Sequence, residues 1–198
     1  SEQRREAILL AAAPLFAERG FAGTSLDDIG SEVGIAGPSV YNHFASKAEI
    51  LLAVMARGAE WLRLEFTHAV RDAPDPATAM ARVVRGYQSF TFANPALVEV
   101  LLVETTNLSK ADRVRIRRVQ HEYIDDWVQL ERATHPEWTT TQARIRAQAS
   151  QMLINDFATA PRLRSRVDVQ EMVADIANAI VGLPARASNR DTARHSTH

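Results

Sequence analysis

The sequence predicts an all-α fold, and three features of the chain indicate it. Apolar residues recur at helical spacing along almost all of the 198 residues, whereas no segment alternates polar and apolar residues for long enough to form a strand. A Ser or Thr followed three positions later by an acidic residue recurs where these patterns begin, as at Ser46 and Ser109. Several glycines and prolines fall between the patterns. We therefore expect helices joined by short turns.

Composition excludes several classes of protein. Hydrophobic residues make up 46% of the chain and charged residues 24%, which is typical of a folded globular protein. The absence of cysteine excludes a disulfide framework and a thiolate metal site. No apolar run reaches the roughly 18 residues that a membrane-spanning helix needs. The first residues do not resemble a signal peptide, so we expect a cytoplasmic location.

Four helices are expected in the first seventy residues, and the second and third of them are short, about eight residues each. The first helix has an apolar stripe from Ile8 to Phe16 and is expected to end near Arg19, because Gly20 favours a left-handed stop. Thr24 is the predicted N-cap of the second helix. A third helix is expected to open at Gly37-Pro38, since proline suits the first helical turn. The long helix then begins after Ser46.

Residues 72–76 form the clearest break in the chain, because they contain two prolines and two aspartates. The helices expected beyond it are interrupted at Asn94-Pro95 and again near His135-Pro136. The last two are expected at about 140–159 and 168–183, followed by a polar tail. We therefore predict a domain of residues 1–47, a helical domain of residues 48–183, and a flexible tail of residues 184–198.

Two short helices joined by a glycine-containing turn, with a longer helix before them, are typical of a DNA-binding helix-turn-helix. Ser39, Asn42 and His43 are expected to point outward from the second short helix, where a major groove would lie. Charge does not support this interpretation, since the chain has a net charge of −1 and residues 1–47 hold four basic and six acidic side chains. The expectation of DNA binding therefore rests on the helical pattern.

The stretch from Phe16 to Leu51, FAERGFAGTSLDDIGSEVGIAGPSVYNHFASKAEIL, resembles the signature of the TetR family of repressors, and the resemblance covers residues of about 5–55. It implies an all-α homodimer that reads DNA with its third helix, binds a ligand in its C-terminal domain and dimerises through its last two helices. The sequence departs from the family pattern at Gly30 and Val33, where alanine is usual, and at Ala36, where a serine or threonine often caps the helix.

The resemblance also assigns DNA-contacting residues by matched position. Those implied to contact phosphates are Thr24, Tyr41, His43 and Lys47. Those implied to face base edges or thymine methyl groups are Gly37, Pro38, Ser39 and Asn42. The alternative for Tyr41 is a core position, and its ring could be buried while its hydroxyl stays exposed.

The C-terminal domain carries two further sets of candidate residues. Aromatic and polar residues at helical spacing could line an effector cavity or simply form core: Tyr87, Phe90, His121, Trp127, Met152 and Asn155. Apolar stripes on the last two helices are expected to form the dimer interface: Ile145, Ala149, Met152, Leu153, Val169, Val173, Ile176 and Ile180. A basic run in residues 110–118 could bind a phosphorylated ligand, but an exposed face with an Arg118–Glu122 ion pair is the stronger alternative.

These observations predict a homodimeric repressor that binds a palindromic operator and is released by a small apolar or amphipathic effector. The alternative is a DNA-binding regulator that is controlled by a protein partner or acts without a ligand. An enzyme is not expected, since the six histidines lack metal-binding spacing and no phosphate-binding loop follows a strand. No cofactor or metal ion is expected either.

Overall fold

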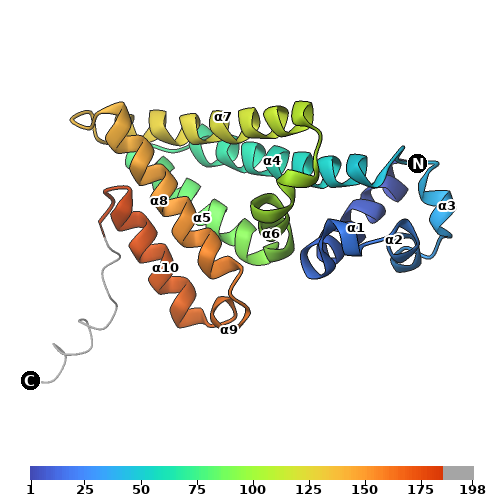
Figure 1. Cartoon of the computed structure of the whole chain (residues 1–198). Helices are drawn as coiled ribbons and strands as arrows, with labels where there is room; N and C mark the ends of the chain where they lie inside the picture. Colours follow the sequence, from blue (N-terminus) through green and yellow to red (C-terminus); the bar gives the residue numbers. More distant parts are fainter. Residues whose placement is uncertain (185–198) are drawn as a thin grey trace, which may run out of the picture.

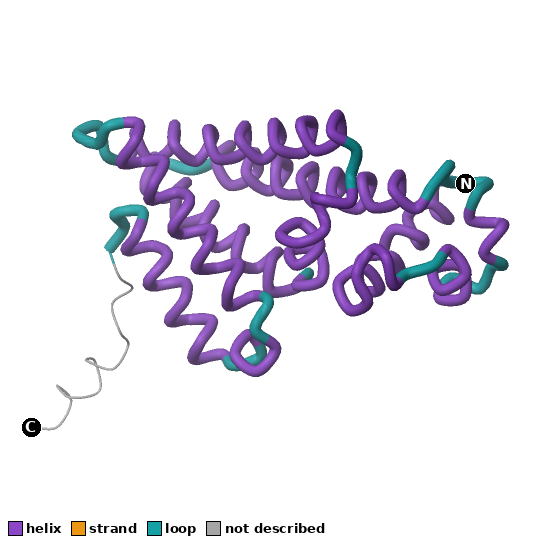
Figure 2. Tube along the Cα trace, viewed as in Figure 1, coloured by secondary structure: helices purple, strands orange, loops and turns teal. Residues whose placement is uncertain are grey.

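The computed structural model describes residues 1–184, and this part of the chain is helical with short loops and no strand (Figure 2). The molecule is elongated (Figure 1). The helices α1, α2 and α3 lie at one end, α8 and α10 lie at the other, and the long helices α4 and α7 run side by side between them. The expected all-α fold is confirmed.

The first three helices are α1 (Glu2–Gly23), α2 (Leu26–Glu32) and α3 (Gly37–Val40). Helical geometry in α1 is broken at Gly20, whose φ of 71° is the left-handed conformation expected at the end of the first helix. The N-cap of α2 is Ser25 and not Thr24: its hydroxyl accepts from the amide of Asp28, whose carboxylate accepts from the Ser25 amide. The expected cap was therefore wrong by one residue. Helix α3 has four residues, half the length expected.

The middle of the chain follows the expected breaks. Helix α4 spans Lys47–Arg71 and is capped by Ser46, and α5 spans Pro76–Ala93 and is capped by Asp75. Helix α6 (Pro95–Val103) begins at the predicted Asn94-Pro95 break and continues into a 3-10 turn, η1 (Glu104–Asn107). Proline has no backbone N–H, and at the first helical position an N–H would have no acceptor within the helix. This property explains why α5 and α6 both start on proline.

The remaining helices are α7 (Lys110–Thr134), α8 (Thr140–Ala158), α9 (Pro161–Arg164) and α10 (Val167–Ile180). Ser109 caps α7 as the sequence predicts, by accepting from the amide of Asp112. Thr139 and Gln142 form a reciprocal capping box at the start of α8. The four-residue α9 was not predicted, since it is too short for apolar periodicity to reveal it.

Two hydrophobic cores hold the fold together. The first joins α1, α2, α3 and the start of α4, and it also includes Val100, Leu108 and Ile116 from later in the chain. The second lies among α5, α7, α8 and α10 around the fully buried Trp127. Helix α4 begins at the predicted domain boundary of residue 47, yet its residues Ile50 to Met55 pack in the first core. This helix therefore contributes to both cores.

Within residues 1–184, no helix combines the length and the hydropathy that a membrane crossing requires. The predicted tail of residues 184–198 lies, apart from Pro184, outside the described residues.

Candidate nucleic-acid interface and ligand cavity

Helices α2 and α3 are packed unusually closely. A Cβ atom added to Gly37 would lie 1.9 Å from Oδ1 of Asp27 and 3.0 Å from its Cα, and one added to Gly30 would lie 2.7 Å from the carbonyl oxygen of Ile35. Gly30, which departs from the family pattern, therefore occupies a position with no room for alanine in this chain. This close contact fixes the orientation of α3 relative to α2.

The surface of α3 and the turn after it presents most of the residues predicted to contact bases. Pro38 and Asn42 are exposed, and Ser39 and His43 are half-buried. Tyr41 is 59% exposed, so it lies outside the core and its whole side chain can reach a partner. Gly37 is buried and contributes only backbone. Val40 and Phe44 point the other way, into the core, and hold this surface in place.

Two of the predicted phosphate contacts are engaged within the protein. Thr24 is 1% exposed and its hydroxyl donates to the carbonyl oxygens of Leu15 and Gly20, so the expected contact of this side chain with a phosphate is wrong. The Lys47 ammonium donates to the carbonyl oxygens of Phe21 (2.5 Å) and Thr24 (2.7 Å). It closes the loop between α1 and α2, a role that the sequence pattern did not reveal.

The other basic side chains of residues 1–47 are engaged in the same way. Arg4 donates to the carbonyl oxygen of Val33, and Arg5 donates to that of His43 while its guanidinium lies 4.0 Å from the centre of the Phe44 ring. Arg19 pairs with Asp28 at 3.0 Å. All four basic side chains of this segment therefore have partners in the protein itself.

The second candidate site is a cavity of about 500 Å³ among α4, α5, α6, α7 and α8. Five of the six residues predicted to line an effector site line it: Tyr87, Phe90, His121, Met152 and Asn155. The sixth, Trp127, does not line it and is fully buried in the second core. The inclusion of Trp127 was therefore wrong; Tyr123, one turn earlier on α7, lies at the cavity instead.

Polar groups converge on this cavity. The Tyr87 hydroxyl donates to Oδ1 of Asn155 at 2.9 Å, and burial raises the pKa of Tyr87 to about 12, so the hydroxyl keeps its proton near neutral pH. Gln151 is 8% exposed and its side-chain nitrogen has no hydrogen-bond partner within the described residues. Gln148 lines the cavity one turn before it. Buried donors without partners are costly unless a ligand satisfies them.

The predicted dimer residues divide between the surface and the core. Ile145 (61%), Met152 (70%) and Ile176 (44%) are exposed large apolar side chains on α8 and α10. Val173 is 1% exposed and packs in the second core, so a second copy of the chain cannot reach it and its assignment was wrong. The exposed Met172 (60%) was missed, although it lies four residues before Ile176 on the same face. The half-buried members of the predicted set are Ala149, Leu153, Val169 and Ile180.

The N-terminal helices match a known family of regulators. Residues 8–54, which span α1 to the first turns of α4, match the family described as bacterial regulatory proteins, tetR family. This N-terminal segment is therefore similar to the TetR family over residues 8–54. It is also 32% identical over 89 residues to the HTH-type transcriptional activator FasR of Mycolicibacterium smegmatis. That match covers 45% of this chain and 41% of the relative, so it spans less than half of the relative's length.

Solved structures share the TetR-type fold over nearly the whole chain. A TetR-family regulatory protein from Rhodococcus RHA1 superposes with a TM-score of 0.79 at 19% identity, covering 95% of this chain and 100% of that one. AibR, whose structure is described as a complex with isovaleryl coenzyme A and operator DNA, superposes with a TM-score of 0.75 at 21% identity, covering 92% and 98%. At these identities the likeness establishes the fold.

The basic run predicted from the sequence lies on the first half of α7. Lys110, Arg115, Arg117 and Arg118 are exposed, while Arg113 donates to the carbonyl oxygens of Thr106 and Leu108. In the described part of the chain, Arg118 and Glu122 form no ion pair, so that expectation was wrong. Residues 1–184 also hold no cluster of three or more His, Cys, Asp or Glu side chains suited to a metal ion.

Proposed function

We propose that this protein is a homodimeric transcriptional repressor that binds a palindromic operator with α3 in the major groove. The observation that carries the proposal is the exposed surface of Pro38, Tyr41 and Asn42 on a segment that is anchored from behind by Val40 and Phe44. An amide side chain can read adenine through two hydrogen bonds, and a tyrosine hydroxyl can donate to a phosphate. Operator binding would place its action in the cytoplasm.

The proposed dimer joins α8 and α10 of two copies. Ile145, Met152, Met172 and Ile176 expose apolar surface on these two helices, and the half-buried Ala149 would allow close approach. Palindromic half-sites one helical turn apart need two linked reading heads, and a two-fold interface supplies them. Dimerisation is therefore part of the DNA-binding mechanism that we propose.

The proposed effector is a small apolar or amphipathic molecule in the cavity of about 500 Å³. Its walls are mostly apolar, and Tyr87, Gln151 and Asn155 supply the few polar groups that orient a ligand in such sites. AibR, which shares the fold, is described with an acyl thioester and operator DNA, which supports an effector of this class. Helix α4 packs in the first core and also lines the cavity, so it can carry a displacement to α3.

DNA selection from random duplexes would identify the operator, and binding would then be measured by fluorescence anisotropy. We expect Asn42→Ala to weaken binding to the selected DNA by about 5- to 150-fold, corresponding to about 1–3 kcal/mol. It should also relax the preference for one base at one position of each half-site. The matched control is Gln129→Ala on α7, far from α3, which should change nothing. Equal affinity of the Asn42→Ala variant for the selected operator would exclude base reading by Asn42, in the turn after α3.

Release would be tested with isovaleryl coenzyme A and with steroids, each titrated against the protein with and without operator. Linkage requires an effector that weakens operator binding to be weakened equally by operator. We expect Asn155→Ala to reduce effector affinity without changing operator affinity. If no small molecule changes operator binding, control by a protein partner becomes the better explanation. A reporter gene whose expression rises when the protein binds would show activation instead of repression.

A further inference from the structure

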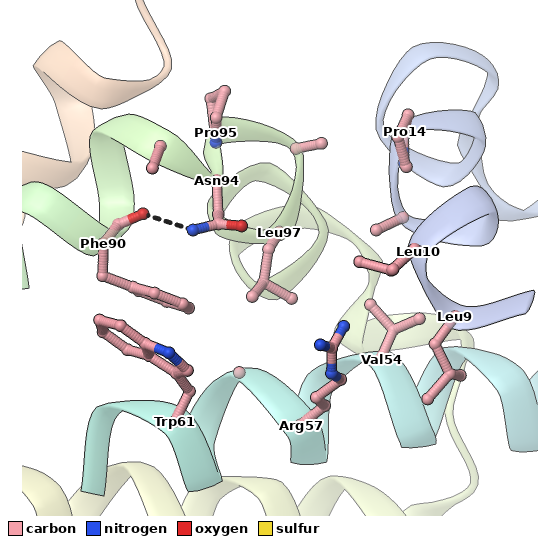
Figure 3. Close-up of a pocket in the computed structure, with 14 residues that line it drawn as sticks. Leu9, Leu10, Pro14, Val54, Arg57, Trp61, Phe90, Asn94, Pro95 and Leu97 are labelled. Atoms are coloured by element: carbon pink, nitrogen blue, oxygen red, sulfur yellow. Dashed lines mark hydrogen bonds between the residues drawn. The ribbon is translucent and has the colours of Figure 1, made fainter. Parts of the chain in front are cut away.

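A second cavity, of about 460 Å³, lies where the N-terminal helices meet the rest of the molecule (Figure 3). One wall is α1, the floor is the middle of α4, and the opposite wall is the corner between α5 and α6. Its volume falls within the range of roughly 300–1,000 Å³ that is usual for small-molecule sites. It shares Phe90 with the proposed effector cavity and is otherwise lined by different residues.

The walls of this junction cavity are apolar and include side chains that are unusually exposed for their type. Trp61 is 37% exposed and stacks on Phe90 with the ring centres 4.1 Å apart and an angle of 18° between the planes. Leu10 on α1 is 57% exposed on the opposite side. A ligand between them would bury apolar surface that the chain leaves in contact with water, which favours an apolar ligand body.

Of the described residues that line the cavity, Arg57 alone carries a charge. Its guanidinium extends from α4 into the space between α1 and α6 (Figure 3). There it pairs with Glu6 of α1, which does not line the cavity, and the two side chains are 44% and 41% exposed. Ion pairs between exposed side chains contribute little to stability, so a second carboxylate can share or replace the Glu6 contact. A guanidinium holds a carboxylate through two parallel hydrogen bonds.

We propose that the junction cavity is a second ligand site, which takes a small apolar monocarboxylate. The carboxylate binds Arg57, and the apolar body lies between Trp61 and Leu10. Because α1 carries part of the first core and α5 part of the second, a bound ligand contacts both halves of the molecule. The site has only Phe90 in common with the proposed effector cavity, and this proposal stands whether or not the proposed effector function is correct.

Octanoate and octan-1-ol form a matched pair of probes, because they differ only in the charged group. Isothermal titration into the full chain should give an octanoate affinity about tenfold or more above that of octan-1-ol, which is the usual size of a charge-assisted contact. Arg57→Gln should abolish this difference, and Arg57→Lys should restore part of it. Glu6→Gln should strengthen octanoate binding, since it frees Arg57 from its competitor.

Two further variants fix the location. Ala93→Phe places a ring at an exposed position that lines the junction cavity, so it should block octanoate while leaving the circular dichroism spectrum unchanged. Asn155→Ala alters only the effector cavity and should leave octanoate affinity unchanged. The proposal is overturned if octanoate does not bind, if it binds no better than octan-1-ol, or if Asn155→Ala weakens it while Arg57→Gln does not.

Discussion

Some side chains in this protein make contacts that their position in the sequence does not predict. Lys47 follows a helix cap, where a cation suggests an external anion. In the structure its ammonium instead donates hydrogen bonds to two carbonyl oxygens around the loop between α1 and α2. It also lies 4.4 Å from the centre of the Phe21 ring. The sequence reveals the position of a helix start but not the loop that folds back over it, because that contact joins residues more than twenty positions apart.

Lys47→Ala should therefore destabilise the protein itself. The variant leaves the carbonyl oxygens of Phe21 and Thr24 without their donor, and the cost of such a loss is about 1–3 kcal/mol. Thermal unfolding should shift down by about 2–4 °C for each kcal/mol in a chain of this size. Arg63→Ala, which removes an exposed pair with Glu60 on the same helix, is the control and should change little. Equal melting temperatures for both variants would contradict this role of Lys47.

Glu131 is a buried carboxyl group whose raised pKa predicts that stability depends on pH. It is 0% exposed, its two oxygens have no hydrogen-bond partner within the described residues, and burial raises its pKa from 4.5 to about 8 despite the nearby charge of Arg146. The folded protein therefore keeps this proton over a pH range in which the unfolded chain has lost it. Stability from this group is complete below pH 4.5 and is lost as the pH rises towards 8.

Glu131→Gln removes the titrating group and keeps its shape. We expect the fall in unfolding free energy between pH 5 and pH 8 to be smaller by about 1–3 kcal/mol in this variant than in the unchanged chain. Urea unfolding at a series of pH values would measure it. The exposed Glu171→Gln is the matched control. Parallel pH curves for the Glu131→Gln variant and the unchanged chain would mean that Glu131 is already ionised in the fold.

At the scale of the helices, the sequence predicts long elements well and their exposed faces poorly. Breaks at Asp75-Pro76 and Asn94-Pro95 are local chemistry, so the bounds of α5 and α6 could be predicted. Helix α10 is apolar on two faces: Val173 and Ala177 are buried, while Met172 and Ile176 are exposed. Periodicity alone merges these faces into one stripe. Which face meets the core depends on contacts with α5 and α8, which a single sequence does not contain.

The packing of α2 against α3 depends on a glycine, and a second glycine provides its control. Gly37→Ala should lower the unfolding free energy by about 1–3 kcal/mol and weaken DNA binding, because its Cβ would overlap Asp27. Gly86→Ala, in the middle of α5, meets no atom closer than 4.0 Å and should raise stability by about 0.5–1 kcal/mol. Chemical denaturation measures both. A Gly37→Ala variant as stable as Gly86→Ala would show that the two helices can separate without cost.

At the scale of the whole molecule, the far ends serve different proposed roles. The first core presents α3 at one end, and α8 and α10 present exposed apolar side chains at the other (Figure 1). The proposed effector cavity lies between these ends, and five of its lining residues could be predicted from aromatic and polar spacing. The junction cavity could not be predicted, since it brings together α1, α4 and α6 from separate parts of the chain.

Ile176→Glu should convert the proposed dimer to monomers, because it places a charge on the exposed apolar face of α10. Sedimentation velocity would detect the change, and operator affinity should be lost with it. Leu64→Glu is the control: Leu64 has a similar exposure of 45% but lies on α4. A Leu64→Glu variant that dissociates while the Ile176→Glu variant stays dimeric would move the interface to α4.

The engagement of Arg4, Arg5, Arg19 and Lys47 within the protein bears on how it would search a chromosome. Attraction to bulk DNA arises mainly from counterions that are released when lysine and arginine neutralise phosphates, and all four such side chains of residues 1–47 already have a partner within the protein. The protein would spend little time on unrelated sequence, and its binding would depend only weakly on salt. Few molecules would be bound non-specifically along the genome. Occupancy of the operator would therefore follow the concentration of free protein closely.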